Sequence, residues 1–311
     1  MAMFKPGLVH TPVTPFLGDQ SVDYETYGKI IEFHMRQGAD ALALPMPEGE
    51  DLSLTDGEQR KLLEFAIGQV GGRVPVIAHV SDAGTALAVA RAVHAEKTGA
   101  AAIVSHPPYF WHPKPAMVVE HLVRIGSAVG LPLFIYNPPV ETAGTSLTTE
   151  ITLQLIERLP NLAGVVDASF DWVFMAEAVS NGRRLRPEFQ MLPGAEFMVS
   201  AFVLGGGGAF SPLSGIAPRL IHDLYNLCSE EKYIEARPLQ EDIAALYHVV
   251  KEAGASGLKD GLAGIKAAIA AMGRPCGLPR SPVHPLGVSE RERFVKQIAG
   301  MAFLKNEPQG W

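Results

Sequence analysis

The chain has 311 residues and a net charge of −7; 47% of its residues are hydrophobic and 19% are charged. This balance supports a sizeable core and excludes an intrinsically disordered chain. The length fits one large α/β domain or two small ones. The basic residues are scattered, so the sequence carries no nucleic-acid-binding footprint.

Cysteine content and apolar segments give expectations about location. Cys228 and Cys276 are expected to be free thiols in a reducing cytoplasm rather than a disulfide. The first residues, MAMFKPG, lack the apolar core of a signal peptide. No stretch approaches the ~18 uninterrupted apolar residues of a membrane span. We therefore expect a cytoplasmic protein with no membrane partner.

Short apolar runs alternate with longer amphipathic segments along most of the chain. The expected strands are residues 8–16, 39–46, 74–80, 100–105, 131–137, 162–167, 189–192 and 207–212. The expected helices are residues 24–37, 55–70, 84–98, 116–129, 148–159, 171–180, 197–204 and 218–229. Near-continuous apolar strands are typical of a parallel sheet that is buried on both faces.

The repeated strand–helix units predict a (β/α)8 TIM barrel over residues 1–228, with a doubly wound open sheet as the alternative. Three more helical patterns, residues 230–254, 261–273 and 289–304, predict a C-terminal helical region over residues 229–311. In a barrel, catalytic groups come from the carboxyl ends of the strands. The polar side chains at these positions are acidic, aromatic, hydroxyl, amide or imidazole groups, with no lysine or arginine: Glu48, Glu50, Asp51, His79, Ser81, Asp82, Ser105, His106, Tyr109, Trp111, His112, Tyr136, Asn137, Glu141, Asp167, Ser169, Glu196, Ser211 and Ser214.

Several stretches carry a resemblance to a known family. They are TPVTPF at 11–16, EGEDLSLTDGEQRKLLE at 48–64, PPYF at 107–110, IYNPP at 135–139, GVVDAS at 164–169, GGGGAFSPLSGIAPRLI at 205–221 and IKAAIAAMG at 265–273. Together they resemble the dihydrodipicolinate synthase / N-acetylneuraminate lyase family of class I aldolases over nearly the whole chain. The resemblance implies a lyase without a bound cofactor that acts on a small molecule, and a homotetramer.

The family's functional residues transfer only in part. The family's Schiff-base lysine aligns with Val166, and its threonine pair after the second strand aligns with Pro47 and Glu48. Its second tyrosine after the fourth strand is Phe110, and its carboxylate-binding arginine position is Glu141. The catalytic tyrosine and the asparagine after it are kept as Tyr136 and Asn137, and Tyr109 keeps the first tyrosine of PPYF.

These changes agree with one another in chemical terms. A Schiff base needs an amine with a lowered pKa, which valine cannot supply. The carboxylate of a keto acid needs hydroxyl, amide or guanidinium donors, and Glu48 and Glu141 would repel it. A shift in the alignment does not restore the amine, because no lysine lies between Lys114 and Lys232.

We therefore expect a divergent lyase-type enzyme that works without a Schiff base. The expected catalytic residues are Tyr136, Glu48 and Asp167. The expected substrate-binding residues are Glu141, Tyr109, Phe110, Asn137, Val166, His79 and Ser211, with no metal ligands. Two alternatives stay open: a catalytically silent binding or scaffold protein on the same fold, and a metal-dependent aldolase or hydrolase that uses His79, His106 and Glu48.

Overall fold

The computed structural model describes residues 3–110, 112–139, 145–253 and 261–311. Eight parallel strands form one sheet in the order β7-β6-β5-β4-β3-β2-β1-β8. The strands are β1 Leu8–His10, β2 Ala41–Leu44, β3 Val76–His79, β4 Ala102–Ser105, β5 Leu133–Asn137, β6 Leu162–Asp167, β7 Gln190–Pro193 and β8 Ala209–Ser211. The first and last strands of this order lie against each other, and the Gly207 N–H donates to the Met191 carbonyl at 3.1 Å. The chain is a TIM barrel, as predicted.

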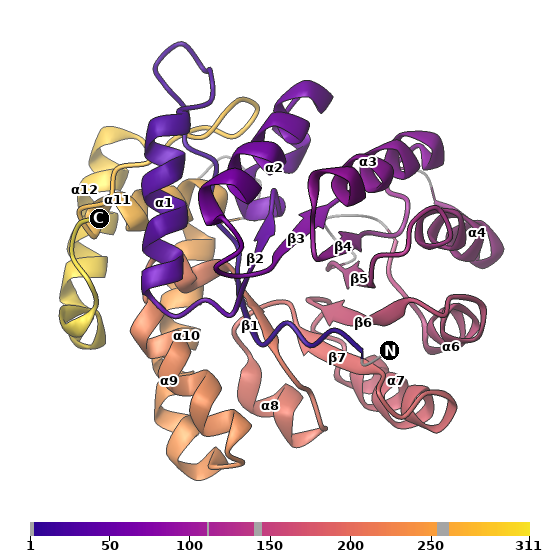
Figure 1. Cartoon of the computed structure of the whole chain (residues 1–311). Helices are drawn as coiled ribbons and strands as arrows, with labels where there is room; N and C mark the ends of the chain where they lie inside the picture. Colours follow the sequence, from indigo (N-terminus) through magenta and orange to yellow (C-terminus); the bar gives the residue numbers. More distant parts are fainter. Residues whose placement is uncertain (1–2, 111, 140–144, 254–260) are drawn as a thin grey trace.

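Helices alternate with the strands and surround them (Figure 1). They are α1 Tyr24–Arg36, α2 Asp56–Val70, α3 Thr85–Thr98, α4 Pro115–Gly126, α6 Thr149–Arg158, α7 Trp172–Leu185, α8 Met198–Val203 and α9 Pro218–Ser229. Three more helices follow: α10 Tyr233–Glu252, α11 Leu262–Ala271 and α12 Val288–Gly300. Within the described residues, no helix is both long enough and apolar enough to cross a membrane.

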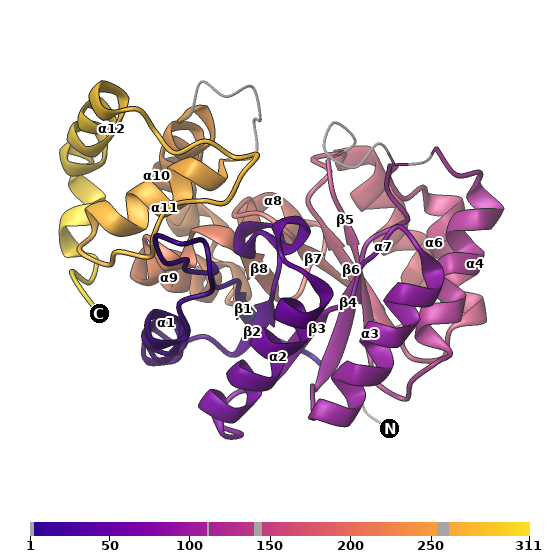
Figure 2. The same cartoon turned by 90° about the horizontal axis from the view of Figure 1, so that it is seen from above.

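The C-terminal helices lie to one side of the barrel, beyond α1 and α9 (Figure 2). Their buried side chains belong to the same apolar cluster as residues of the barrel itself. This cluster joins Ile243 and Leu246 of α10 and Ile269 of α11 with Leu8 of β1 and Ile221 of α9. The predicted helical extension is confirmed, and its division from the barrel at residue 228 stays a prediction.

Alternate strand residues point into the barrel and fill it. Val9, Ile77, Val104, Phe134 and Phe210 form the centre of this interior cluster. Phe4 joins it, with its ring 6.2 Å from that of Phe134. Because side chains alternate along a strand, neighbouring residues of β6 face opposite sides. Val166 belongs to the interior cluster, whereas Val165 packs outward under the helices.

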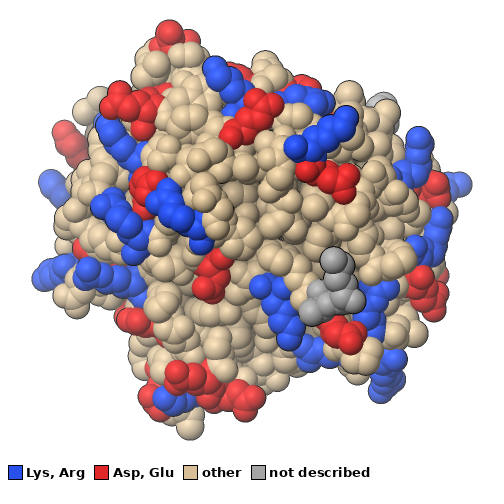
Figure 3. All heavy atoms as spheres, in the orientation of Figure 1, with Lys and Arg blue, Asp and Glu red and all other residues tan. Residues whose placement is uncertain are grey.

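Local sequence signals explain several boundaries. Helix α2 begins with the predicted capping box, in which Thr55 and Glu58 satisfy each other's backbone N–H groups. β1 is shorter than the predicted residues 8–16, since Pro12 and Pro15 cannot donate to a strand ladder. Charged side chains of both signs are spread over the face seen in Figure 3, with no large patch of one sign.

Candidate active site

Tyr136 and Val166 stand side by side at the carboxyl end of the barrel. They are paired residues of β5 and β6, and both belong to the interior cluster. Val166 is fully buried and Tyr136 is 6% exposed. A side chain at position 166 therefore projects into the barrel beside that of Tyr136. The position that the resemblance assigns to the Schiff-base lysine is an inward-facing aliphatic residue in this chain.

Glu48 enters this end of the barrel from the loop after β2. It lies in a short 3-10 turn, Pro47–Gly49, and the Thr14 hydroxyl fixes the turn by donating to the Gly49 carbonyl at 2.6 Å. Burial raises the pKa of Glu48 to about 7; the negative charge of Glu196 adds to this effect and a hydrogen bond with Thr11 opposes it. The Oε2 atom of Glu48 is buried, with no hydrogen-bond partner among the described residues.

Glu196 follows β7 and is completely buried. Its Oε1 accepts from the Ser211 hydroxyl at 3.0 Å and from the backbone N–H of Leu213. Burial raises the pKa of Glu196 to about 7. Its Oε2 has no partner in the part of the chain that the structure describes. The predicted binding residue Ser211 thus holds Glu196, which was a strand-end candidate but not among the expected catalytic residues.

Tyr136 is kept neutral by its surroundings. Burial raises its pKa well above the usual value, and the negative charges of Glu48, Asp167 and Glu196 act in the same direction, as does Tyr247. The phenol is therefore protonated at neutral pH and can donate a hydrogen bond. Because three carboxyl groups lie within electrostatic reach of Tyr136, their ionised forms attract positive charge to this end of the barrel and repel anions.

Asn137 and Asp167 lie on the opposite side of their strands from Tyr136 and Val166. Asp167 Oδ1 accepts from Asn137 Nδ2 at 2.7 Å and from Ser169 Oγ at 2.8 Å. Asn137 Oδ1 in turn accepts from the Leu147 N–H at 2.7 Å, which ties the strand ends to the chain before α6. Asp167 Oδ2 is buried without a partner among the described residues, so its catalytic role stays a prediction.

A row of rings continues from Tyr136 across the ends of β4 and β3. The His106 ring stacks on Tyr136 at 4.9 Å, and the His79 ring lies 4.8 Å from His106. His79 Nε2 is 2.7 Å from the Ser81 hydroxyl, and its Nδ1 is 3.6 Å from Asp51. Burial lowers the pKa of His79 well below its usual value, so the ring is neutral. No group of three or more His, Cys, Asp or Glu side chains within the described residues is arranged to hold a metal ion.

The predicted residues Tyr109 and Phe110 lie farther out. Tyr109 is partly buried with its ring 6.5 Å from His106, and burial together with Asp82 and Asp51 raises its pKa to about 12. Phe110 is 81% exposed, in the left-handed region at φ 72°. Glu141 lies outside the described residues.

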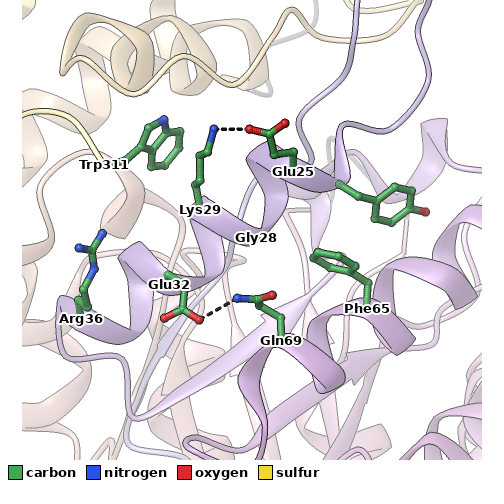
Figure 4. Close-up of a pocket in the computed structure, with 9 residues that line it drawn as sticks. Glu25, Gly28, Lys29, Glu32, Arg36, Phe65, Gln69 and Trp311 are labelled. Atoms are coloured by element: carbon green, nitrogen blue, oxygen red, sulfur yellow. Dashed lines mark hydrogen bonds and ion pairs between the residues drawn. The ribbon is translucent and has the colours of Figure 1, made fainter.

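A hollow of about 620 Å³ lies elsewhere, on the outside of the barrel between α1, α2 and the C-terminal Trp311 (Figure 4). Two pairs of its polar side chains bind each other: Lys29 pairs with Glu25 at 2.8 Å, and Gln69 donates to Glu32 at 2.8 Å. None of the strand-end residues lines it. The candidate active site is therefore the carboxyl end of the barrel.

Known proteins share this fold and sequence pattern. The sequence model of the Dihydrodipicolinate synthetase family matches residues 5–300. The 4-hydroxy-tetrahydrodipicolinate synthase of Caldicellulosiruptor bescii is 30% identical over 299 residues, which cover 96% of this chain and 97% of that protein. The protein of the same name from Bartonella bacilliformis is 31% identical over 301 residues, with 96% and 99% covered.

The solved structure of dihydrodipicolinate synthase from Aquifex aeolicus superposes with a TM-score of 0.88 at 25% identity. The match covers 98% of this chain and 99% of that one. Sequence and fold thus agree over almost the full length, and we conclude that this chain belongs to the dihydrodipicolinate synthetase family, whose activity is of the lyase type.

Proposed function

We propose that this chain is a lyase-type enzyme that acts on a small molecule without a Schiff base, with Tyr136 as the donor and the buried carboxyl groups beside it as the base of its acid–base chemistry. One observation carries the proposal: Tyr136 is grouped with the buried carboxyl groups of Glu48 and Glu196, next to an aliphatic residue at position 166. The same grouping gives no amine for the inherited chemistry, since strands β5 to β8 and the loops between them contain no lysine.

The grouping suits acid–base cleavage of a hydroxy-carbonyl compound. The pKa of Glu48 and that of Glu196 are both about 7, so near neutral pH one group can hold a proton while the other is ionised. The ionised carboxylate removes the proton of a substrate hydroxyl, and that oxygen forms the C=O bond of one product as the adjacent C–C bond breaks. The electron pair of the broken C–C bond passes to the neighbouring carbonyl oxygen and gives an enolate. The carboxyl group that holds a proton then protonates this enolate at carbon, which completes the second product. Tyr136 donates a hydrogen bond to the oxyanion that forms there.

Trapping with borohydride tests the absence of a Schiff base. Wild-type protein incubated with pyruvate and borohydride is expected to show no mass adduct. A Val166→Lys variant, which places an amine at the carboxyl end of the barrel (the mouth), is expected to gain one. One trapped equivalent on the wild type would contradict the proposal. Peptide mapping would then identify the lysine, with Lys114 and Lys251 as the first positions to inspect.

Turnover tests the rest of the proposal. A panel of neutral and cationic hydroxy-carbonyl compounds is screened for cleavage by the wild type, and each active compound is repeated with Tyr136→Phe and Glu48→Gln. The proposal fails if both variants turn over the compound at the wild-type rate. A ligand that binds but is never cleaved would favour the catalytically silent alternative. The metal-dependent alternative lacks a suitable set of ligands among the described residues.

The proposal includes the homotetramer that the resemblance implies and the cytoplasmic location expected from the cysteines and the apolar pattern of the sequence. Large apolar side chains stand exposed at the start of α7, where Trp172 is 47% and Val173 is 65% exposed. Exposed apolar surface of this kind is typical of a subunit contact. Sedimentation equilibrium of the wild type and of Val173→Glu gives the test, and a wild type that is monomeric at every concentration would contradict the assembly.

A further inference from the structure

Three aromatic rings meet beside the candidate active site, and no predicted function accounts for them. Phe170 follows β6, Phe197 follows β7, and Tyr247 comes from α10, which packs against α8 (Figure 2). The Phe170 and Phe197 centroids are 5.4 Å apart at 87°, and Tyr247 lies 6.1 Å from Phe170 at 62° and 5.6 Å from Phe197 at 81°. The planes of Phe170, Phe197 and Tyr247 are thus steeply inclined to one another, and the three rings form a corner that presents aromatic faces on several sides. All three side chains reach solvent, since none is fully buried.

A cation of the protein already lies over this corner. Lys251 Nζ is 5.5 Å from the ring centre of Tyr247 and 5.9 Å from that of Phe170. Lys251 follows Tyr247 by one helical turn of α10. Within the described part of the chain, no carboxylate pairs with Lys251, and its ammonium group lies over the two rings instead. The corner therefore binds positive charge through the ring quadrupoles.

The buried carboxyl group of Glu196 lies within electrostatic reach of the same corner. Glu196 directly precedes Phe197 in the chain and is completely buried, and its Oε2 has no partner among the described residues. Burial, followed by the charges of Glu196 and Glu48, raises the pKa of Tyr247 to about 12, so both carboxyl groups lie within electrostatic reach of its phenol. A buried oxygen of this kind is costly unless a donor satisfies it.

We infer that the mouth of this barrel recognises a small molecule through a primary ammonium group, held between the faces of Phe170, Phe197 and Tyr247 and the free oxygen of Glu196. An ammonium group offers N–H donors to the carboxyl oxygen and positive charge to the rings at once. A carboxylate ligand would be repelled by Glu196 and Glu48. A neutral sugar has no positive charge to interact with the faces of the three rings. This inference names the substrate class of the proposed function and rests on the same site.

Binding of simple probes tests the inference without any turnover. Ethylammonium chloride is titrated into the full-length protein at pH 8, followed by saturation-transfer NMR, with sodium acetate as the anionic counterpart. Ethylammonium is expected to bind and acetate is not. Glu196→Gln is expected to weaken ethylammonium binding at least tenfold, and Phe170→Leu several-fold, because leucine keeps the apolar bulk but removes the ring face.

Two further variants separate this site from non-specific binding. Lys251→Met removes the competing cation, so ethylammonium affinity is expected to rise, which a purely structural role of Lys251 would not produce. Phe65→Leu, at the outer hollow, is the matched control and is expected to leave the affinity unchanged. Equal affinity in wild type, Glu196→Gln, Phe170→Leu and Lys251→Met would overturn the inference, as would preferential binding of acetate.

The outcome is independent of the proposed chemistry. Loss of turnover in Tyr136→Phe together with no ethylammonium binding would overturn the inference and leave the proposed function standing. Ethylammonium binding that depends on Glu196 and Phe170 supports the inference even if no compound is ever cleaved, and the proposed enzyme activity would then be the part that fails.

Discussion

The phenol of Tyr136 is the one group that the sequence resemblance, the strand register and the electrostatics all select. It lies beside position 166 and within electrostatic reach of Glu48 and Glu196. Its neutrality follows from burial beside carboxyl groups. That combination suits hydrogen-bond donation to an oxyanion. The neighbouring valine has no polar group, and an ionised glutamate has no proton to donate.

Replacing this phenol tests its role. Tyr136→Phe is expected to lower kcat by about 10²–10³-fold with little change in KM, since an oxyanion donor acts mainly in the transition state. Tyr27→Phe is the matched control, because Tyr27 is also a buried tyrosine but lies on α1, and its hydroxyl has no partner among the described residues. Steady-state kinetics on any active compound gives the result. Equal losses in the two variants would point to a packing effect instead of chemistry.

The buried carboxyl of Glu196 makes stability depend on pH in a predictable direction. The pKa of Glu196 is about 7 in the folded chain against a reference value of 4.5. Between pH 4.5 and pH 7 its carboxyl group is therefore protonated in the folded state and ionised in the unfolded state. Stability from this group is therefore greatest below pH 4.5 and is lost as the pH rises towards 7. At about 1.4 kcal/mol per unit of pKa shift, the loss is on the order of 3 kcal/mol.

Glu196→Gln removes that titration while keeping the shape and the acceptor for Ser211. Between pH 5 and pH 8 the wild type is expected to lose roughly 2–3 kcal/mol more unfolding free energy than Glu196→Gln. Urea denaturation at both pH values measures it, with the exposed Glu188→Gln as the control. An unchanged pH dependence in Glu196→Gln would mean that Glu196 is already ionised in the folded protein.

Among the elements, the loop between β2 and α2 connects the mouth to the C-terminal helices. Glu48 points to the mouth, while Glu50, two residues on, is buried against Lys266 of α11 as an ion pair. Glu50 also accepts from the Arg280 N–H at 2.8 Å, and Lys266 Nζ lies 4.3 Å from the ring centre of Phe16. The ion pair thus fixes the loop that carries Glu48.

Breaking one side of this pair is expected to be costly. Lys266→Met leaves the Glu50 carboxylate buried without its counter-charge, which is expected to lower the unfolding free energy by about 3–5 kcal/mol. The double variant Lys266→Met/Glu50→Leu is expected to recover much of this loss, because no charge is left unpaired. Urea denaturation of the wild type, both single variants and the double variant gives the coupling. Additive losses would show that the two side chains do not stabilise each other.

The sequence predicted the helices and strands more completely than the residues of the candidate active site. The alternation of apolar runs predicted the strands, because a parallel barrel buries both faces of each one, and Thr55 with Glu58 predicted the start of α2. It left Glu196 among many rim residues, because only the fold brings it to Ser211 and Tyr136. It could not find Tyr247, which reaches the mouth from α10, a helix outside the repeating strand–helix pattern.

At the scale of the whole molecule, barrel and extension share one core and one site. The apolar cluster that contains Leu8 of β1 and Ile221 of α9 also contains Ile243, Leu246 and Ile269 of the C-terminal helices. The extension further supplies Tyr247 beside Glu196, Gln240, whose Nε2 donates to the Glu196 carbonyl at 2.6 Å, and Lys266 against Glu50. The barrel alone therefore lacks part of its core and part of its mouth.

A fragment of residues 1–228 tests whether the predicted boundary separates two folding units. We expect this fragment to lose cooperative unfolding and to bind a hydrophobic dye, since it exposes the face of α9 that α10 covers in the full chain. Circular dichroism melts and dye fluorescence, compared with the full chain, measure both effects. A fragment that melts in one sharp transition without dye binding would establish the barrel as an independent domain. The contacts of Tyr247, Gln240 and Lys266 would then serve the site rather than the fold, and the same three residues would remain the means by which the extension positions Glu48 and Glu196.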